Sequence, residues 1–215
     1  AGGLWDKYPV EQVATPEGYA RNPELVINFY NERRKQLLDV VPNAGHLGVA
    51  DLERDFNVTV VTQNVDNLHE RAGSTHVIHL HGELTKVCSS RDPYNPHFVK
   101  ELAPEEYEVK LGDKAGDGTQ LRPFIVWFGE SVPEIETAIR YVEQADIFVI
   151  IGTSLNVYPA AGLLNYVPRA AEVYLIDPKP VDTHVMRPIH VIQKGASEGV
   201  KELKALLTAT QPPLP

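Results

Sequence analysis

The stretch TVVTQNVDNLHERAGSTHVIHLHGEL, residues 59–84, decides the fold of this 215-residue chain. β-branched residues over 58–62 are typical of a buried strand, and residues 77–81 predict a second strand. Polar side chains gather just past the end of the first strand, and they are Gln63, Asn64, Asp66, Asn67 and His69. Because α/β sheets bind ligands at the carboxyl ends of their strands, this cluster predicts a functional site.

Helical and strand patterns alternate along the rest of the chain. Helices are predicted over 23–39, 43–56, 133–144, 159–166 and 196–207, and strands over 123–128, 145–154, 172–177 and 189–193. The unbroken apolar run at 147–151 predicts a central parallel strand. Residues 86–120 are expected to form an insertion of loop and local helix outside the main sheet. The alternation indicates an α/β fold with a doubly wound parallel sheet.

The first two helices carry recognisable signals. Asn22 suits the N-cap of the first helix, and Pro23 suits its first position. In the second helix, Leu47, Val49, Leu52 and Phe56 are expected to face inward.

Composition restricts the function class. The net charge of −9 and the pI of about 5.4 argue against binding to nucleic acid or to an anionic membrane, which requires a basic face. There is no apolar run of membrane-spanning length and no signal peptide, so a cytoplasmic protein is expected. The single cysteine, Cys88, excludes an intramolecular disulfide and a zinc site built from cysteines.

Each polar cluster also has a plainer interpretation. Gln63 and Asn64 could simply cap a turn. His79 and His81 lie on one face of a strand, so they could be ordinary half-buried histidines, or two ligands of a metal with no third ligand evident. Residues 152–154, Gly-Thr-Ser, could be a turn or a phosphate-binding loop.

Four motifs resemble the sirtuins, the NAD-dependent protein lysine deacylases. They are QNVD at 63–66, HLHG at 79–82, VWFGE at 126–130 and GTSLNVYPA at 152–160. They stand in the family's order and spacing, and the resemblance runs from residue 2 to about 207, weakest over 88–120.

The resemblance implies a domain organisation within a single catalytic unit, 1–215. A Rossmann-like large domain would comprise residues 43–85 and 121–210. Residues 1–42 would form the helical part of a smaller domain, and 86–120 the equivalent of the family's zinc module. The family's first strand and Gly-rich loop are expected upstream of Ala1.

The resemblance also implies a reaction on acylated lysine in proteins or peptides. The acyl oxygen attacks the nicotinamide ribose of NAD, nicotinamide leaves, and a histidine takes a proton from a ribose hydroxyl. The products are free lysine, nicotinamide and 2′-O-acyl-ADP-ribose. Neutral imidazole suits the role of base, because its ordinary pKa is about 6.5.

Site residues follow from the matched motifs. His81 corresponds to the base, and His79 is expected to pack. The cofactor-binding residues would be Gln63, Asn64, Asp66, Gly152, Thr153, Ser154, Asp177 and Ala196. The substrate-binding residues would be Ala14, Tyr30, Arg33, Val126, Phe128, Gly129, Glu130, Leu155 and Val157. Of these, Asp177 departs from the asparagine that the family often has.

The acyl group is suggested by Tyr30 and Arg33, three residues apart on one helix face. By itself the basic run at 33–35 is typical of an exposed helix face. Within the resemblance, the pair is similar to that of the subgroup that removes succinyl and malonyl groups, whose carboxylate Arg33 and Tyr30 would bind. Ala14 would leave room for the longer acyl chain, and deacetylation remains compatible.

One departure concerns zinc. The family usually carries two Cys-x-x-Cys pairs, and only Cys88 stands where the first pair would begin, so no zinc and no other metal is expected. Two other functions stay open, a mono-ADP-ribosyltransferase and a non-catalytic NAD or ADP-ribose binding module. His81 and the Tyr30/Arg33 pair favour the deacylase.

Overall fold

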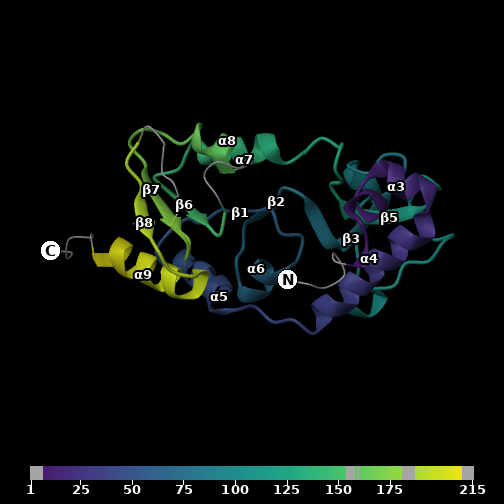
Figure 1. Cartoon of the computed structure of the whole chain (residues 1–215), viewed down its shortest axis with the longest axis horizontal. Helices are drawn as coiled ribbons and strands as arrows, with labels where there is room; N and C mark the ends of the chain where they lie inside the picture. The colour runs from purple at the N-terminus through teal and green to yellow at the C-terminus, as the bar shows by residue number, and fades with distance from the viewer. Residues whose placement is uncertain (1–6, 154–157, 159, 181–186, 210–215) are drawn as a thin grey trace. The chain divides into compact units, whose positions relative to one another are not determined.

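The computed structural model describes residues 7–153, 158, 160–180 and 187–209 (Figure 1). Contacts divide the chain into two compact units. The first unit comprises residues 1–41, 61–67 and 79–134, and the second comprises 42–60, 68–78 and 135–215. No helix among the described residues is both long enough and apolar enough to cross a membrane.

The second unit contains a parallel sheet in the order β6-β7-β8. Its strands are β6 (Ile147–Ile151), β7 (Glu172–Ile176) and β8 (His190–Ile192). In register, Val149 pairs with Tyr174, and Tyr174 pairs with His190. The parallel sheet, with a helix between β6 and β7 and another after β8, confirms the predicted α/β class. Among the described strands, however, β7 is the middle one, so the expectation that the run at 147–151 is central was wrong for this sheet.

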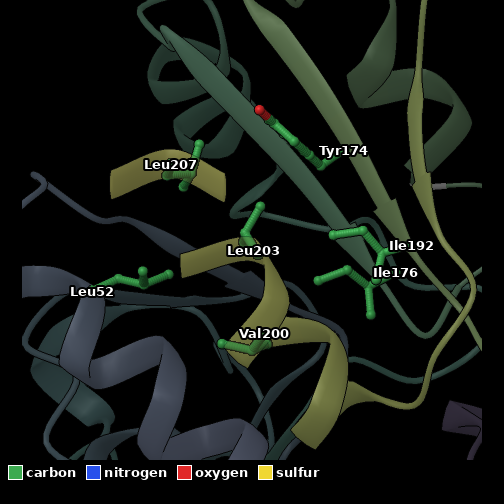
Figure 2. Packing of buried hydrophobic residues seen from close by; sticks show 7 residues of the cluster. All are labelled: Leu52, Tyr174, Ile176, Ile192, Val200, Leu203 and Leu207. Carbon is green, nitrogen blue, oxygen red and sulfur yellow. The ribbon is translucent and has the colours of Figure 1, made fainter. Parts of the chain in front are cut away.

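One helix layer covers this sheet. It contains α5 (Ala44–Asp51) and α9 (Ala196–Ala209). The same unit also contains α7 (Ile135–Val142) and α8 (Ala160–Leu164). Figure 2 shows the core between α9 and the strands, made of Leu52, Tyr174, Ile176, Ile192, Val200, Leu203 and Leu207. A Cβ at Gly199 would lie 2.2 Å from Ile176 Cγ2, so α9 approaches β7 closely.

The second predicted helix ends earlier than expected. α5 stops at Asp51, and a 3₁₀ turn, η1 (Leu52–Arg54), continues it. Leu52 and Phe56 pack in the core as predicted, but Leu47 is 52% exposed, and its predicted inward orientation was wrong. The one buried residue of α5 is Gly45, and Leu47 lies on the outer face of the helix.

The first unit begins with three helices, α2 (Val10–Val13), α3 (Pro16–Arg21) and α4 (Pro23–Leu38). The Asn22 side chain accepts a hydrogen bond from the N–H of Leu25 at 3.2 Å, and Pro23 is the first helical residue. This confirms the predicted start of the helix. α4 buries Val26, Phe29 and Tyr30 on its inner face.

An antiparallel sheet in the order β4-β3-β5 packs in the first unit. Its strands are β3 (Gly82–Ser89), β4 (Lys100–Glu101) and β5 (Leu121–Ile125), with 3₁₀ turns η2 (Pro96–Phe98) and η3 (Pro104–Glu106) between them. Residues 86–120 therefore contain strand, which the sequence did not predict. The strand expected at 123–128 begins and ends earlier and pairs antiparallel with β3. Buried Arg34 joins α4 to this region by donating to the carbonyls of Leu84 and Tyr107 at 2.8 and 3.0 Å.

The stretch at 59–84 forms β1 (Val60–Thr62), α6 (Leu68–Ala72) and β2 (Val77–His79). β1 and β2 pair in a two-stranded sheet, as the two predicted strands suggest, although both are shorter than expected. The N–H of Leu80, the residue after β2, donates to the carbonyl of Thr62, the last residue of β1, at 3.0 Å. The polar residues of the candidate site begin directly after Thr62, with Gln63 and Asn64.

Candidate active site

The loop that follows β1 is held by the chain at 79–84. Nδ1 of His79 lies 3.0 Å from the carbonyl oxygen of Asn64, and the N–H of Leu84 donates to Val65 at 2.8 Å. Within the loop, the N–H of Asn64 donates to the Thr62 hydroxyl at 3.0 Å. The predicted cofactor residues Gln63, Asn64 and Asp66 therefore lie on a backbone with fixed anchors. His79, expected only to pack, is buried and supplies one of these anchors.

His81 is half-buried beside the same loop. Burial lowers the pKa of its imidazole below the ordinary value of 6.5, and a hydrogen bond with the backbone of Gln63 opposes that shift. The ring is therefore neutral at pH 7 and able to accept a proton. The structure brings His81 and Gln63 together, as the sequence motifs suggested.

The segment at 126–130 begins beside His81. The N–H of Val126 donates to the carbonyl of His81 at 2.9 Å, and the N–H of Phe128 donates to Ala14 at 3.0 Å. Ala14 is thus hydrogen-bonded to the short segment that contains Val126. Both residues are predicted to bind substrate. Phe128 is 69% exposed, which leaves its side chain on the surface.

A tight turn follows at 127–130. The N–H of Glu130 donates to the carbonyl of Trp127 at 3.0 Å, and Gly129 has a φ of +93°. Only glycine adopts this conformation at low cost in such a turn. Phe128 and Gly129 are both exposed at this turn.

The Glu130 carboxylate points inward to Arg122. The two guanidinium nitrogens Nη1 and Nη2 of Arg122 donate to Glu130 at 3.0 and 3.1 Å. Glu130 Oε1 also accepts from the hydroxyl of Tyr94 at 3.0 Å and from the N–H of Trp127 at 2.8 Å. Burial alone would raise the pKa of Glu130, but the hydrogen bonds and charge of Arg122 outweigh it and hold the pKa below its usual value.

Sequence reasoning missed Arg122 and the inward role of Glu130. An arginine within the apolar strand sequence LRPFIVW is a signal, because a buried arginine needs a partner. The partner eight residues later could not be identified from spacing alone.

Tyr30 and Arg33 are neighbours on α4, as their spacing predicted. The Arg33 guanidinium carbon lies 5.9 Å from the ring centroids of both Tyr30 and Phe29. Burial lowers the pKa of Arg33, and electrostatic interactions with Tyr30 and Asp66 oppose that shift. Tyr30 is fully buried, donates its hydroxyl proton to the carbonyl of Val13 at 2.9 Å, and accepts from Trp127 Nε1 at 3.0 Å. Its proton therefore already has an acceptor in the structure.

The described cofactor residues of the second unit lie at strand ends of the parallel sheet. Gly152 follows β6, has a φ of +68°, and donates its N–H to Ile176 at 3.1 Å. Asp177 follows the neighbouring strand β7, and its carboxylate accepts from the N–H of Lys179 at 2.8 Å. A Cβ at Gly152 would meet nothing within 4 Å, so its φ, and not crowding, requires glycine.

The other residues predicted in this unit are only partly described. Thr153 is half-buried, and Ala196 is the first residue of α9. Ser154, Leu155 and Val157 lie outside the described residues. Backbone amides and a carboxylate at the carboxyl edge of a parallel sheet fit the phosphates and ribose hydroxyls of a dinucleotide.

Hydrogen bonds tie the ends of the 86–120 region together near Cys88. The Cys88 thiol is fully buried, and burial raises its pKa to about 12. Next to it, the hydroxyl of buried Ser89 donates to Asp117 at 2.5 Å and lies 3.0 Å from the hydroxyl of Thr119. The Cys88 thiol donates to the carbonyl of Pro123 at 3.8 Å, and a single thiol in a chain with no second cysteine does not fit the four sulfur or nitrogen ligands of a structural zinc.

Known proteins show the same combination of motifs and fold. A Sir2 family model matches residues 1–159. A Bacteroides thetaiotaomicron protein named NAD-dependent protein deacylase is 84% identical over 207 residues, which are 96% of this chain and 88% of that protein. A Helicobacter pylori protein of the same name is 46% identical over 203 residues, covering 94% of this chain and 86% of that protein.

A solved structure agrees with the fold. A Sir2 homolog in complex with NAD has a TM-score of 0.79 and 35% identity, covering 97% of this chain and 82% of the other. The Rossmann-like α/β class and the family resemblance of the four motifs are thereby confirmed. On the strength of motifs, fold and relatives together, the chain belongs to the Sir2 family, the sirtuins.

Proposed function

We propose that this chain is an NAD-dependent protein-lysine deacylase that removes succinyl and malonyl groups and retains some deacetylase activity. One observation carries the deacylase part of the proposal. A half-buried histidine of lowered pKa, His81, is hydrogen-bonded through its own carbonyl to Val126, the residue proposed to receive the substrate lysine. The names of the Bacteroides and Helicobacter relatives support the same activity.

Each part of the site has a role in this reaction. NAD supplies the ribose carbon that takes up the acyl oxygen, with nicotinamide as the leaving group. Neutral His81 accepts the proton of a ribose hydroxyl, and Gln63 orients that ribose by a hydrogen bond. Asn64 and Asp66 bind the nicotinamide amide, for which an amide and a carboxylate offer matching donors and acceptors.

The acylated lysine would lie along the segment at 126–130. The carbonyl of Val126 accepts the lysine N–H, and the backbone of the turn at Phe128, Gly129 and Glu130 pairs with the peptide. In the second unit, Gly152, Thr153, Ser154, Asp177 and Ala196 would bind the phosphates and adenosine, and Leu155 and Val157 would bind the peptide.

The acyl preference rests on Arg33. Its guanidinium carries a fixed positive charge that matches the terminal carboxylate of a succinyl or malonyl group. Tyr30 would add a hydroxyl donor, for which its proton must leave the carbonyl of Val13. The small side chain of Ala14, beside the same segment, leaves room for the acyl chain.

The test uses the full-length protein, NAD and one peptide carrying acetyl-, malonyl- or succinyl-lysine, with products identified by mass spectrometry. The proposal expects free lysine, nicotinamide and acyl-ADP-ribose. ADP-ribosylated protein would identify a mono-ADP-ribosyltransferase instead. NAD binding without any product would identify a non-catalytic module.

The acyl preference has its own variant. Arg33→Met should lower kcat/KM for the succinyl peptide by about 100-fold, because a charge-assisted bidentate contact is lost, and should lower deacetylation far less. Lys35→Met is the matched control, since Lys35 is an exposed cation near the end of the same helix. Equal losses on both peptides in Arg33→Met would overturn the acyl assignment and leave the deacylase intact.

A further inference from the structure

Trp127 is attached at three points in the first unit. It is 2% exposed, and its backbone N–H donates to Glu130 Oε1 at 2.8 Å. The guanidinium carbon of Arg122 lies 3.8 Å from the centroid of its ring. Its indole N–H donates to the hydroxyl oxygen of Tyr30 at 3.0 Å. The side chain therefore connects the proposed peptide-binding turn to the proposed acyl site.

The indole determines what the Tyr30 hydroxyl can do. An indole N–H only donates, so the hydroxyl oxygen must accept at this contact. The one hydroxyl proton then has to point elsewhere, and it points to the carbonyl of Val13 at 2.9 Å. Burial raises the pKa of Tyr30 to about 12, so the proton stays on the oxygen at physiological pH. Trp127 thus makes the Tyr30 hydroxyl an acceptor on the side of the indole and leaves it a donor on the opposite side.

The indole itself is held firmly. Arg122 stacks on its ring and is fixed by its paired bonds to Glu130, and Nη2 of Arg122 also donates to the carbonyl of Ile125 at 2.7 Å. Tyr94 supplies a further donor to the same carboxylate. A buried and fully bonded network of this kind keeps its members in one geometry.

We infer that Trp127 is a specificity-positioning residue that holds the Tyr30 hydroxyl as a dedicated donor for acyl groups ending in a carboxylate. This inference rests on the proposed acyl preference and adds a residue to it. A carboxylate held by Arg33 would compete with the Val13 carbonyl for the Tyr30 proton, and the charged acceptor makes the stronger bond. A hydroxyl that accepts from the indole is also the better donor. An acetyl group offers no such acceptor, so it gains nothing from Trp127.

The test is a double-mutant cycle. Trp127→Phe keeps an aromatic ring and removes the indole N–H, and Tyr30→Phe removes the hydroxyl. The measured quantity is the ratio of kcat/KM for succinyl- and acetyl-lysine versions of one peptide. Tyr30→Phe should lower this ratio about tenfold and Trp127→Phe about threefold, since a hydrogen bond to a charge is lost or misdirected. The double variant should match Tyr30→Phe alone.

Tyr19→Phe is the matched control. The Tyr19 ring packs on Trp127 with centroids 5.3 Å apart, but its hydroxyl lies 2.7 Å from Ser90 and not from the indole. Tyr19→Phe should therefore leave the ratio of the two kcat/KM values unchanged. Thermal melts of all variants separate selectivity from loss of folded protein.

The outcomes distinguish the two proposals. A ratio that Trp127→Phe leaves unchanged, or lowers equally with and without the Tyr30 hydroxyl, overturns the role of Trp127. If Arg33→Met also leaves the ratio unchanged, the acyl preference itself is wrong. If Arg33→Met lowers the ratio and Tyr30→Phe does not, the acyl preference stands on Arg33 and the role of Trp127 is overturned.

Discussion

The backbone N–H of Val126 donates to the carbonyl oxygen of His81 at 2.9 Å. The two residues that would supply the base and the acceptor of the substrate lysine are therefore joined by a single hydrogen bond between two chain segments. This bond fixes the spacing of their backbones, and the His81 ring is placed from there by its own side-chain torsions. Fixed backbones of this kind help to hold two bound molecules in a reactive geometry.

His81→Asn should lower kcat/KM for deacylation by at least about 100-fold, because the amide cannot accept the ribose proton. Initial rates with saturating NAD check this. His190→Asn is the control, because His190 is an exposed histidine of β8 that pairs with Glu172, and its activity should be unchanged. A His81→Asn protein that keeps a tenth of its activity would exclude His81 as the base.

The pH profile should follow the lowered pKa of His81. A protonated imidazole cannot act as a base, so the rate is lost as pH falls through the pKa of the enzyme. Since burial moves this pKa below 6.5, kcat/KM should be constant through pH 7 and fall only at lower pH. Rates measured from pH 5 to 8 with a substrate that does not titrate provide the check. An acid limb centred above pH 7 would contradict the neutral base.

Glu130→Ala should destabilise the protein by about 3 kcal/mol, because it leaves the Arg122 charge buried without its partner. The two side chains are 5% and 14% exposed. The lowered pKa of Glu130 means that this stabilisation is present above its ordinary value of 4.5 and is lost as pH falls through the folded pKa. Urea unfolding of the unchanged protein and of Glu130→Ala should therefore show a smaller difference in unfolding free energy at pH 4 than at pH 7.

The control for that variant is Glu172→Ala. The Glu172 carboxylate lies 2.7 Å from Nε2 of His190, these two side chains are 61% and 52% exposed, and the loss of this contact should cost less than about 1 kcal/mol. Equal destabilisation by the two variants would mean that burial does not govern the Arg122–Glu130 pair.

Gly129→Ala should cost about 1–2 kcal/mol, because an L-residue is strained at its φ of +93°. An added Cβ there meets nothing within 4 Å, so the cost is conformational. Because the turn is the proposed peptide site, KM for the peptide should rise more than kcat falls. Gly112→Ala is the control, since Gly112 is equally uncrowded, has a φ of +99° and lies outside this turn, so it should likewise cost about 1–2 kcal/mol and leave KM unchanged.

Elemental analysis of the purified protein should find well under one zinc per chain, and a strong chelator should leave the melting temperature unchanged. The reason is the ligand set, which offers one thiol where a structural zinc site needs four sulfur or nitrogen ligands. Ser89→Ala should lower the melting temperature, because Ser89 bonds Asp117 and Thr119 across the region. One zinc per chain, or a chelator-induced fall in stability, would contradict this prediction.

The sequence predicted the elements that depend on local signals. The start of α4 at Pro23 follows from the Asn22 cap, and the parallel strands at the C-terminal end follow from their apolar runs. The i, i+3 spacing correctly predicted that Tyr30 and Arg33 lie side by side. These features need only residues that are close in the chain.

Features that depend on distant partners were not predictable. The strand residues within 86–120 are the end of β3 and the whole of β4. They form by pairing with other segments of the chain, and no local sequence pattern predicts them. The basic run at 33–35 resembles an exposed face, yet Arg34 is buried because carbonyls from two distant segments accept its protons. In the same way, the bonds of the Tyr30 hydroxyl to Val13 and Trp127 join residues far apart in the chain, and the spacing of Tyr30 and Arg33 does not predict them.

The buried thiol of Cys88 can report local opening of the first unit. Its pKa of about 12 leaves almost no thiolate at neutral pH, and its side chain has no exposed surface. An alkylating reagent therefore reacts only when the first unit opens around β3. Since the chain has no second cysteine, the labelling rate measures the free energy of that local opening without any engineered probe.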